Sequence, residues 1–273
     1  MFSFFKKKPL APPPALPDFM PFEPPAEPAP PAPAAPIPLA NGDGAIGVVW
    51  TTDKGESGSG LTAGTRTFNP SGGLVELSAA GKGKKLFEKG VTVDPGADGI
   101  VAWGRWTNGE SKVKDAAGKG DGRTTSLHYV AFAGQPLLPV VVGSFSSFAS
   151  TAPTVSKGGQ LVAVGEVNSA RGSVSVALLS LVGGSANYSL VVPVAGQTFS
   201  LVGQATQVST FGFSGVSDIR STGTGCDGGC TGSLGNNVSV IGLVGGAAGN
   251  RAGINYGFDS RIGNVSGVIV FKR

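Results

Sequence analysis

The chain has 273 residues, of which 45 are glycine, 40% are hydrophobic and 14% are charged. This composition excludes a long helical protein, and the apolar content after Asn41 is enough to fill a sizeable core. The net charge of +4 at pH 7 is too small to indicate nucleic-acid binding, and no basic stripe with interleaved aromatic residues appears.

Residues 1–40 differ from the rest of the chain because they contain most of its 20 prolines. Proline lacks a backbone N–H and disfavours helix at the preceding residue, so neither helix nor sheet propagates there. We expect a disordered Pro/Ala-rich arm that acts as a tether rather than an SH3-type ligand. The start, MFSFFKKK, lacks the order of a secretion signal. Its phenylalanines and lysines also permit contact with an anionic membrane surface.

Residues 41–126 are expected to form a small polar β region. Strands are predicted at 45–52, 74–77 and 100–106, separated by glycine turns. The lysines of stretch 82–89 suggest phosphate contacts, but the flanking Glu76 and Glu88 favour a solvated loop.

Residues 127–273 alternate Val and Phe with Ser and Gly in short runs, which predicts an all-β domain. We expect an antiparallel up-and-down barrel of about eight strands. A barrel filled by side chains is favoured over a membrane barrel, because few Trp and Tyr are available for aromatic girdles. The predicted strands are 127–132, 140–148, 159–167, 172–182, 188–194, 199–208, 234–244, 251–258 and 265–272. The residues expected to point inward or pack on the sheet include Val174, Val176, Leu178, Ile254, Tyr256 and Phe271.

The only two cysteines, Cys226 and Cys230, are separated by Asp-Gly-Gly, whose glycines permit a tight turn. They form either a disulfide or two free thiols: an exported protein favours the bridge, and a reducing cytosol favours the thiols. With a single histidine in the chain, they cannot complete a four-ligand zinc site without carboxylates.

Candidates for catalysis are few. The sole histidine, His128, lies in Leu-His-Tyr-Val, where a hydrogen-bonded strand residue is commoner than a general base. Residues 212–216 do not match the Gly-x-Ser-x-Gly motif of a nucleophilic serine, because the last position is not glycine. The glycines of residues 58–64 have the wrong spacing for a dinucleotide-binding loop. We therefore expect no enzyme, no cofactor and no metal.

Several short motifs carry a resemblance to a known family. Gly-Cys-x3-Cys-Thr-Gly-Ser is followed by Arg-Ala-Gly-x-x-Tyr and by a closing Val-Ser-Gly-Val-Ile-Val-Phe, and an aromatic Trp-Gly-Arg-Trp lies upstream of Leu-His-Tyr-Val. Together, over residues 100–271, these motifs resemble the transferrin-binding-protein-B-like β-barrel domains. The residues concerned are Trp103, Gly104, Arg105, Trp106, His128, Tyr129, Arg251, Ala252, Gly253 and Tyr256, with Cys226 and Cys230.

The resemblance implies a handle-like region at 41–126, a barrel domain at 127–273 that opens with strand 127–132, and an exported protein. The predicted function is a non-enzymatic bacterial envelope or cell-surface module that presents loops to an unknown protein or solute partner. Iron acquisition is one setting that the resemblance implies. The alternatives are a structural or sensory appendage of an envelope assembly and a small outer-membrane barrel. We predict that the Cys226–Cys230 disulfide and the envelope location occur together.

Overall fold

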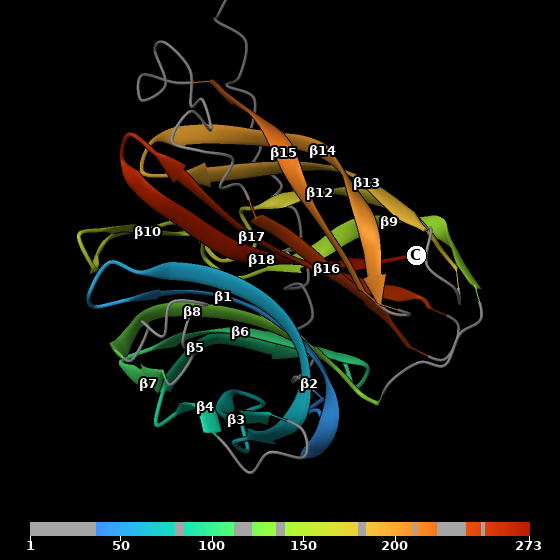
Figure 1. Cartoon of the computed structure of the whole chain (residues 1–273), viewed down its shortest axis with the longest axis horizontal. Helices are drawn as coiled ribbons and strands as arrows, with labels where there is room; N and C mark the ends of the chain where they lie inside the picture. Colours follow the sequence, from blue (N-terminus) through green and yellow to red (C-terminus); the bar gives the residue numbers. More distant parts are fainter. Residues whose placement is uncertain are drawn as a thin grey trace, which may run out of the picture. The chain divides into compact units, whose positions relative to one another are not determined.

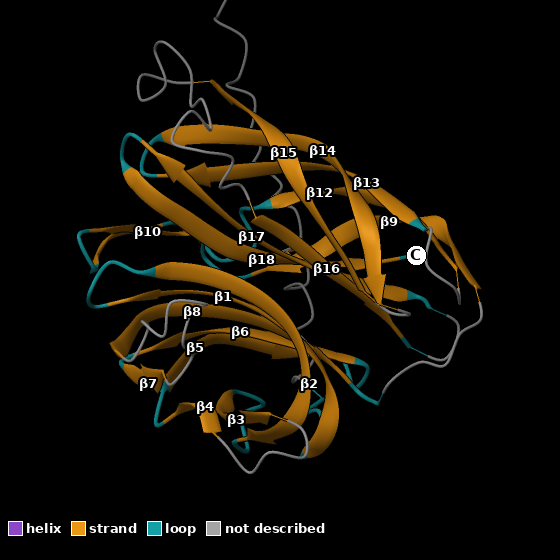
Figure 2. Cartoon of the chain, viewed as in Figure 1, coloured by secondary structure: helices purple, strands orange, loops and turns teal. Residues whose placement is uncertain are grey.

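The structure of the chain is a computed structural model that describes residues 37–79, 85–111, 122–134, 140–179, 184–209, 212–222, 239–246 and 249–273. The proline-rich arm up to residue 36, residues 82–84 of the lysine-rich stretch, and both Cys226 and Cys230 lie outside these residues. Within them every regular element is a β-strand (Figure 2), and none is a helix with the length and apolar character that a bilayer crossing requires.

The first sheet contains eight strands in the hydrogen-bonded order β1-β2-β3-β4-β7-β8-β6-β5. An additional antiparallel pairing of β1 with β8 closes a ring, and β6 and β5 continue the sheet beyond β8 (Figure 1). The strands are β1 (Gly42–Thr52), β2 (Ser57–Phe68), β3 (Leu74–Ala79), β4 (Lys85–Glu88), β5 (Val91–Ala97), β6 (Val101–Thr107), β7 (Gly109–Ser111) and β8 (Gly122–Phe132).

The second sheet has ten strands in the order β11-β10-β18-β17-β16-β15-β14-β13-β12-β9. Pairing of β18 with β9 closes eight of them into an antiparallel barrel, while β10 and β11 form a hairpin that extends from β18 outside the ring. The strands are β9 (Val140–Ser150), β10 (Thr154–Lys157), β11 (Gln160–Val164), β12 (Arg171–Leu179), β13 (Ser185–Val194), β14 (Gln197–Ser209), β15 (Gly212–Thr222), β16 (Ser239–Gly245), β17 (Arg251–Ser260) and β18 (Gly263–Lys272). The predicted fold class is confirmed.

Period-two alternation fills the interior of the barrel. On β12, Val174 and Val176 are buried while Ser173 and Ser175 face outward, because successive strand residues point to opposite faces. The rings of Phe199 and Phe258 meet inside at a centroid distance of 5.1 Å in an edge-to-face arrangement. All six residues predicted to point inward or pack on the sheet are 3% exposed or less and belong to one core cluster, which confirms that prediction: Val174, Val176, Leu178, Ile254, Tyr256 and Phe271.

The first ring has a core of its own. The indole of Trp106 is fully buried and meets the ring of Phe87 edge-on at 5.8 Å, with Leu74, Leu77 and Leu127 in the same cluster. The first sheet has eight strands, whereas the sequence predicted three within residues 41–126 and assigned strand 127–132 to the barrel. The Gly-, Ser- and Thr-rich strands such as β2 carry too weak an apolar pattern to be recognised.

Two strand assignments were wrong. Strand 127–132 was expected to open the C-terminal barrel, but it is the end of β8 and pairs with β1 and β6 in the first sheet. Stretch 159–167 was expected to be one barrel strand. Gly158 and Gly159, both at positive φ, instead form a turn between β10 and β11, and this hairpin stays outside the ring.

The interior aromatic pair predicts a large loss of stability on truncation. Replacing Phe258 with alanine should lower the free energy of unfolding by about 3–5 kcal/mol, because it removes a fully buried ring and leaves a cavity. Val202→Ala, at a position that is 51% exposed on β14, should change it by less than about 0.5 kcal/mol. Urea unfolding of both variants checks this; equal losses would contradict the packed interior.

Candidate functional site

The two sheets share an apolar interface. Residues of β1, β6 and β8 pack against residues of β16 and β18 in a third core cluster: Ala45, Val101, Val130, Phe132, Leu243, Val268 and Val270. A Cβ atom placed on Gly253 of β17 would lie 2.4 Å from a methyl carbon of Val130. The motif glycine therefore provides the space into which β8 packs against the barrel.

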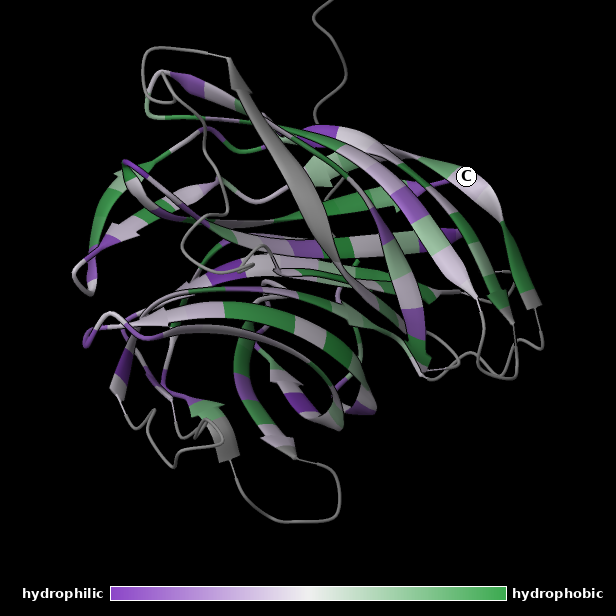
Figure 3. Cartoon of the chain, turned by 45° about the horizontal axis from the view of Figure 1, so that its top comes forward, coloured by the Kyte–Doolittle hydropathy of each residue, from purple (hydrophilic) through white to green (hydrophobic). Residues whose placement is uncertain are grey.

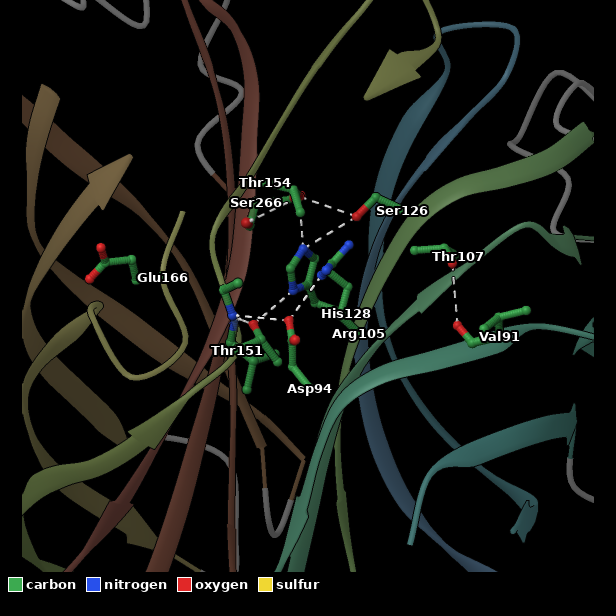
Figure 4. A network of polar contacts seen from close by, with 12 residues as sticks. Val91, Asp94, Arg105, Thr107, Ser126, His128, Thr151, Thr154, Glu166 and Ser266 are labelled. Carbon is green, nitrogen blue, oxygen red and sulfur yellow. Dashed lines mark hydrogen bonds and ion pairs between the residues drawn. The ribbon is translucent and has the colours of Figure 1, made fainter. Parts of the chain in front are cut away.

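A fully buried polar network crosses this interface at His128 (Figure 4). His128 lies on β8, and its Nδ1 is 2.8 Å from Thr151 Oγ1 while its Nε2 is 2.8 Å from Thr154 Oγ1. Ser126 Oγ lies 3.1 Å from Thr154 Oγ1, which in turn lies 3.0 Å from Ser266 Oγ. Both imidazole nitrogens thus bond to hydroxyl groups of the second sheet: Thr151 lies between β9 and β10, and Thr154 is the first residue of β10.

The environment of His128 favours the neutral imidazole. Burial of the ring, together with the positive charge of Arg105 on the neighbouring strand β6, holds the pKa of His128 well below its ordinary value. A neutral, fully enclosed imidazole with two hydroxyl partners cannot reach a substrate in solvent. The geometry therefore assigns His128 to the interface, as the sequence context suggested.

The motif arginine Arg105 makes a second link across the interface. Its Nε donates to Asp94 Oδ2 at 3.1 Å, and the backbone N–H of Ala152, beyond the end of β9, donates to the same oxygen at 3.4 Å. The side chains of Arg105 and Asp94 are 10% and 15% exposed, so water screens this pair only weakly. Asp94 thereby connects β5 and β6 of the first sheet to the segment between β9 and β10.

The motif arginine Arg251 makes a third link. Its Nε donates to Asp98 Oδ2 at 2.6 Å, and its guanidinium lies over the ring of Phe148 at 5.9 Å. Burial alone would raise the pKa of Asp98. Hydrogen bonds from Arg251 and from the backbone N–H groups of Val101 and Ile100 outweigh burial, so this pKa lies below its ordinary value. Trp103 meets Phe148 edge-on at 5.6 Å beside this pair.

The remaining motif residues pack inside the two sheets. Tyr129 Oη accepts a hydrogen bond from the N–H of Leu74 at 2.9 Å, and a Cβ on Gly104 would lie 2.5 Å from that oxygen. Ala252 and Tyr256 are fully buried in the barrel core. The motif residues within the described chain therefore build the cores and the interface. Sequence reasoning missed their partners Asp94, Asp98, Thr151 and Thr154; both aspartates lie at a stretch interpreted only as a turn.

The β10–β11 hairpin and the turn after it expose apolar side chains next to this interface. In the described part of the chain β11 pairs only with β10, and its register shifts at Val162. Val162, Val164 and the following Val167 are 53%, 45% and 49% exposed. The hairpin is tied to the first sheet, because Thr125 Oγ1 donates to the carbonyl of Gly159 at 2.8 Å. A rigid body thus presents three valines to solvent.

Comparison with known proteins gives low-identity likenesses only. No protein-family model matches the chain. No curated protein matches it by sequence. Among solved structures it is similar to transferrin-binding protein B from serogroup B Neisseria meningitidis (TM-score 0.45, 14% identity) and from Haemophilus parasuis (0.42, 14%), and to intact Ap-TbpB with N and C lobes (0.41, 13%). Each likeness covers 84% of this chain, and the chain spans less than half of each of those proteins, 43%, 44% and 46%.

The buried imidazole predicts a loss of stability in acid. Because the pKa of His128 in the folded protein lies below its ordinary value of 6.5, the unfolded chain binds the proton more readily. The free energy of unfolding should therefore fall as the pH drops below about 6.5, by up to about 1.4 kcal/mol per pH unit. Urea midpoints for the full chain and His128→Gln should show the steeper fall in the unchanged chain; parallel curves would contradict this.

The Arg251–Asp98 pair predicts a measurable coupling. In a double-mutant cycle with Arg251→Met and Asp98→Asn, the two losses in unfolding free energy should couple by roughly 1–2 kcal/mol, because each side chain is less than a quarter exposed. The pair Lys89–Glu110, at 3.9 Å with side chains 74% and 48% exposed, is the control and should couple by less than about 0.5 kcal/mol. Equal coupling in the two cycles would refute the assignment.

Proposed function

We propose that the chain is a non-enzymatic binding module of the bacterial cell envelope or cell surface, which presents the β10–β11 hairpin to a protein partner. The observation that carries the proposal is the exposure of Val162 and Val164 on a hairpin bonded to both sheets, together with that of Val167 in the turn that follows the hairpin. Clustered exposed apolar side chains mark interaction surfaces, and a rigid support lowers the entropy cost of binding.

The form of the hairpin favours recognition through side chains. The register shift at Val162 interrupts the ladder, and such bulges hinder unspecific pairing along a free strand edge. The valines stay available to an apolar surface of matching shape. Glu166, exposed beside Val167, supplies a charge at the rim of this surface.

Two further observations support a binding module over the other functions considered. The single histidine is enclosed between the sheets with both nitrogens bonded, which leaves it unsuited to acid–base catalysis. The outward residues of β12 and β13 include Ser173, Ser175, Asn187 and Ser189, and Figure 3 shows polar and apolar residues mixed along these strands. A lipid-facing wall would instead be an apolar band.

Position-specific cross-linking tests the proposal. A photo-reactive amino acid at position 164 of the full chain should give a discrete adduct with a partner in cells, whereas one at position 187, exposed on the barrel wall, should give none. With the photo-reactive amino acid at position 162 instead, the substitution Val164→Asp should abolish the adduct. No adduct at 164, or equal adducts at both sites, would refute docking at the hairpin.

Purified transferrin should be the first protein tested as a partner in this cross-linking experiment, because the similar structures are named as transferrin-binding proteins. A hairpin-dependent transferrin adduct would support iron acquisition. A hairpin-dependent adduct with a fixed component of the envelope would support the structural or sensory appendage instead.

A further inference from the structure

A pocket of about 340 Å³ lies where the tip of the β10–β11 hairpin meets the first sheet. Its lining comes from three places: the turn after β1, the start of β8 with the turn before β7, and the hairpin tip. Figure 1 shows this hairpin beside the turn that joins β1 and β2. The lining side chains that carry hydrogen-bonding groups are Asp53, Asn108, Arg123, Thr124, Thr125 and Gln160.

Backbone contacts fix the shape of this pocket. The N–H of Asp53, in the turn after β1, donates to the carbonyl of Arg123 on β8 at 2.8 Å, which holds the two charged residues next to each other. Gly159 has a φ of +78°, and a Cβ placed there would lie 2.1 Å from the carbonyl oxygen of Asp53. Only glycine allows the hairpin tip to approach the turn this closely, so the walls are held before any ligand arrives.

The pocket contains polar groups without protein partners. Asp53 and Arg123 carry opposite charges, and the structure gives neither side chain an ion pair or hydrogen bond with any described residue. Thr124 is fully buried, and its Oγ1 has no hydrogen-bond partner among the described residues. Less than 1 Å² of this hydroxyl oxygen is accessible, so it lies beneath the pocket wall, and the charged side chains of Asp53 and Arg123 are the groups that a ligand can reach.

We propose that this pocket binds a small zwitterion of the amino-acid class. Arg123 would pair with the ligand carboxylate, for which a guanidinium is suited by its planar fork, and Asp53 would accept hydrogen bonds from the ammonium group. The amides of Asn108 and Gln160 provide hydrogen bonds to the rest of the molecule. A volume of about 340 Å³ is at the small end of ligand pockets and fits a ligand of this size.

Calorimetric titration of the full chain with glycine, L-serine and L-glutamine tests the proposal. At least one should bind, and its N-acetyl and amide analogues, which each lack one charge, should bind about tenfold more weakly or worse. Arg123→Gln and Asp53→Asn should each weaken binding by about tenfold or more. Arg171→Gln, at an exposed arginine that does not line the pocket, should leave the affinity unchanged.

Several results would overturn the inference. Failure of all three zwitterions to bind would exclude the ligand class, as would equally tight binding of the single-charge analogues. Binding that survives both Arg123→Gln and Asp53→Asn would place the site elsewhere. The inference is independent of hairpin docking, because these substitutions leave Val162, Val164 and Val167 in place and cross-linking at 164 is measured separately.

Discussion

The arrangement of the whole molecule depends on Thr151, where the chain leaves the barrel. Up to Ser150 the chain is β9 and pairs with β18; from Thr154 it is β10 and pairs with β18 again, nearer that strand's beginning. Between them, Thr151 Oγ1 accepts the N–H of Val268 and also bonds His128 of the first sheet, while its backbone N–H donates to the carbonyl of Val268. Thr151 thus extends the contact with β18 beyond the end of β9, toward the hairpin, and ties the two sheets together.

The burial of both faces of β17 and β18 follows from this arrangement. One face of each strand fills the barrel and the other meets the first sheet, so Ile254 and Val268 are both fully buried although they serve different cores. Apolar contact alone would let the sheets slide, since it has no direction. The hydrogen bonds of His128, Arg105 and Arg251 add direction and fix one register.

The sequence predicted strands whose two faces differ, because Val174 and Val176 alternate visibly with serines and one face must be buried. It could not place β8, since both faces of that strand are buried and its partner β1 lies far earlier in the chain. The motif residues were recognisable as a group, but their hydroxyl and carboxylate partners were not. Thr151 lies in a loop, Thr154 begins β10 and Asp94 lies within β5, and no sequence pattern marks these residues as partners. Only folding brings them to His128 and Arg105.

The charged residues of the motif form ion pairs that stabilise the fold, whereas the charged residues of the pocket form none with described residues. Arg105 and Arg251 belong to the motif, and each is neutralised by an aspartate beside the interface. Asp53 and Arg123 lie outside the motif, on a turn and a strand end, and the described residues leave both without an ion pair. The valines of the hairpin are likewise outside it. Substitution at the hairpin or the pocket would change what is bound while the interface stays intact, so chains that share these motifs can differ in their ligands.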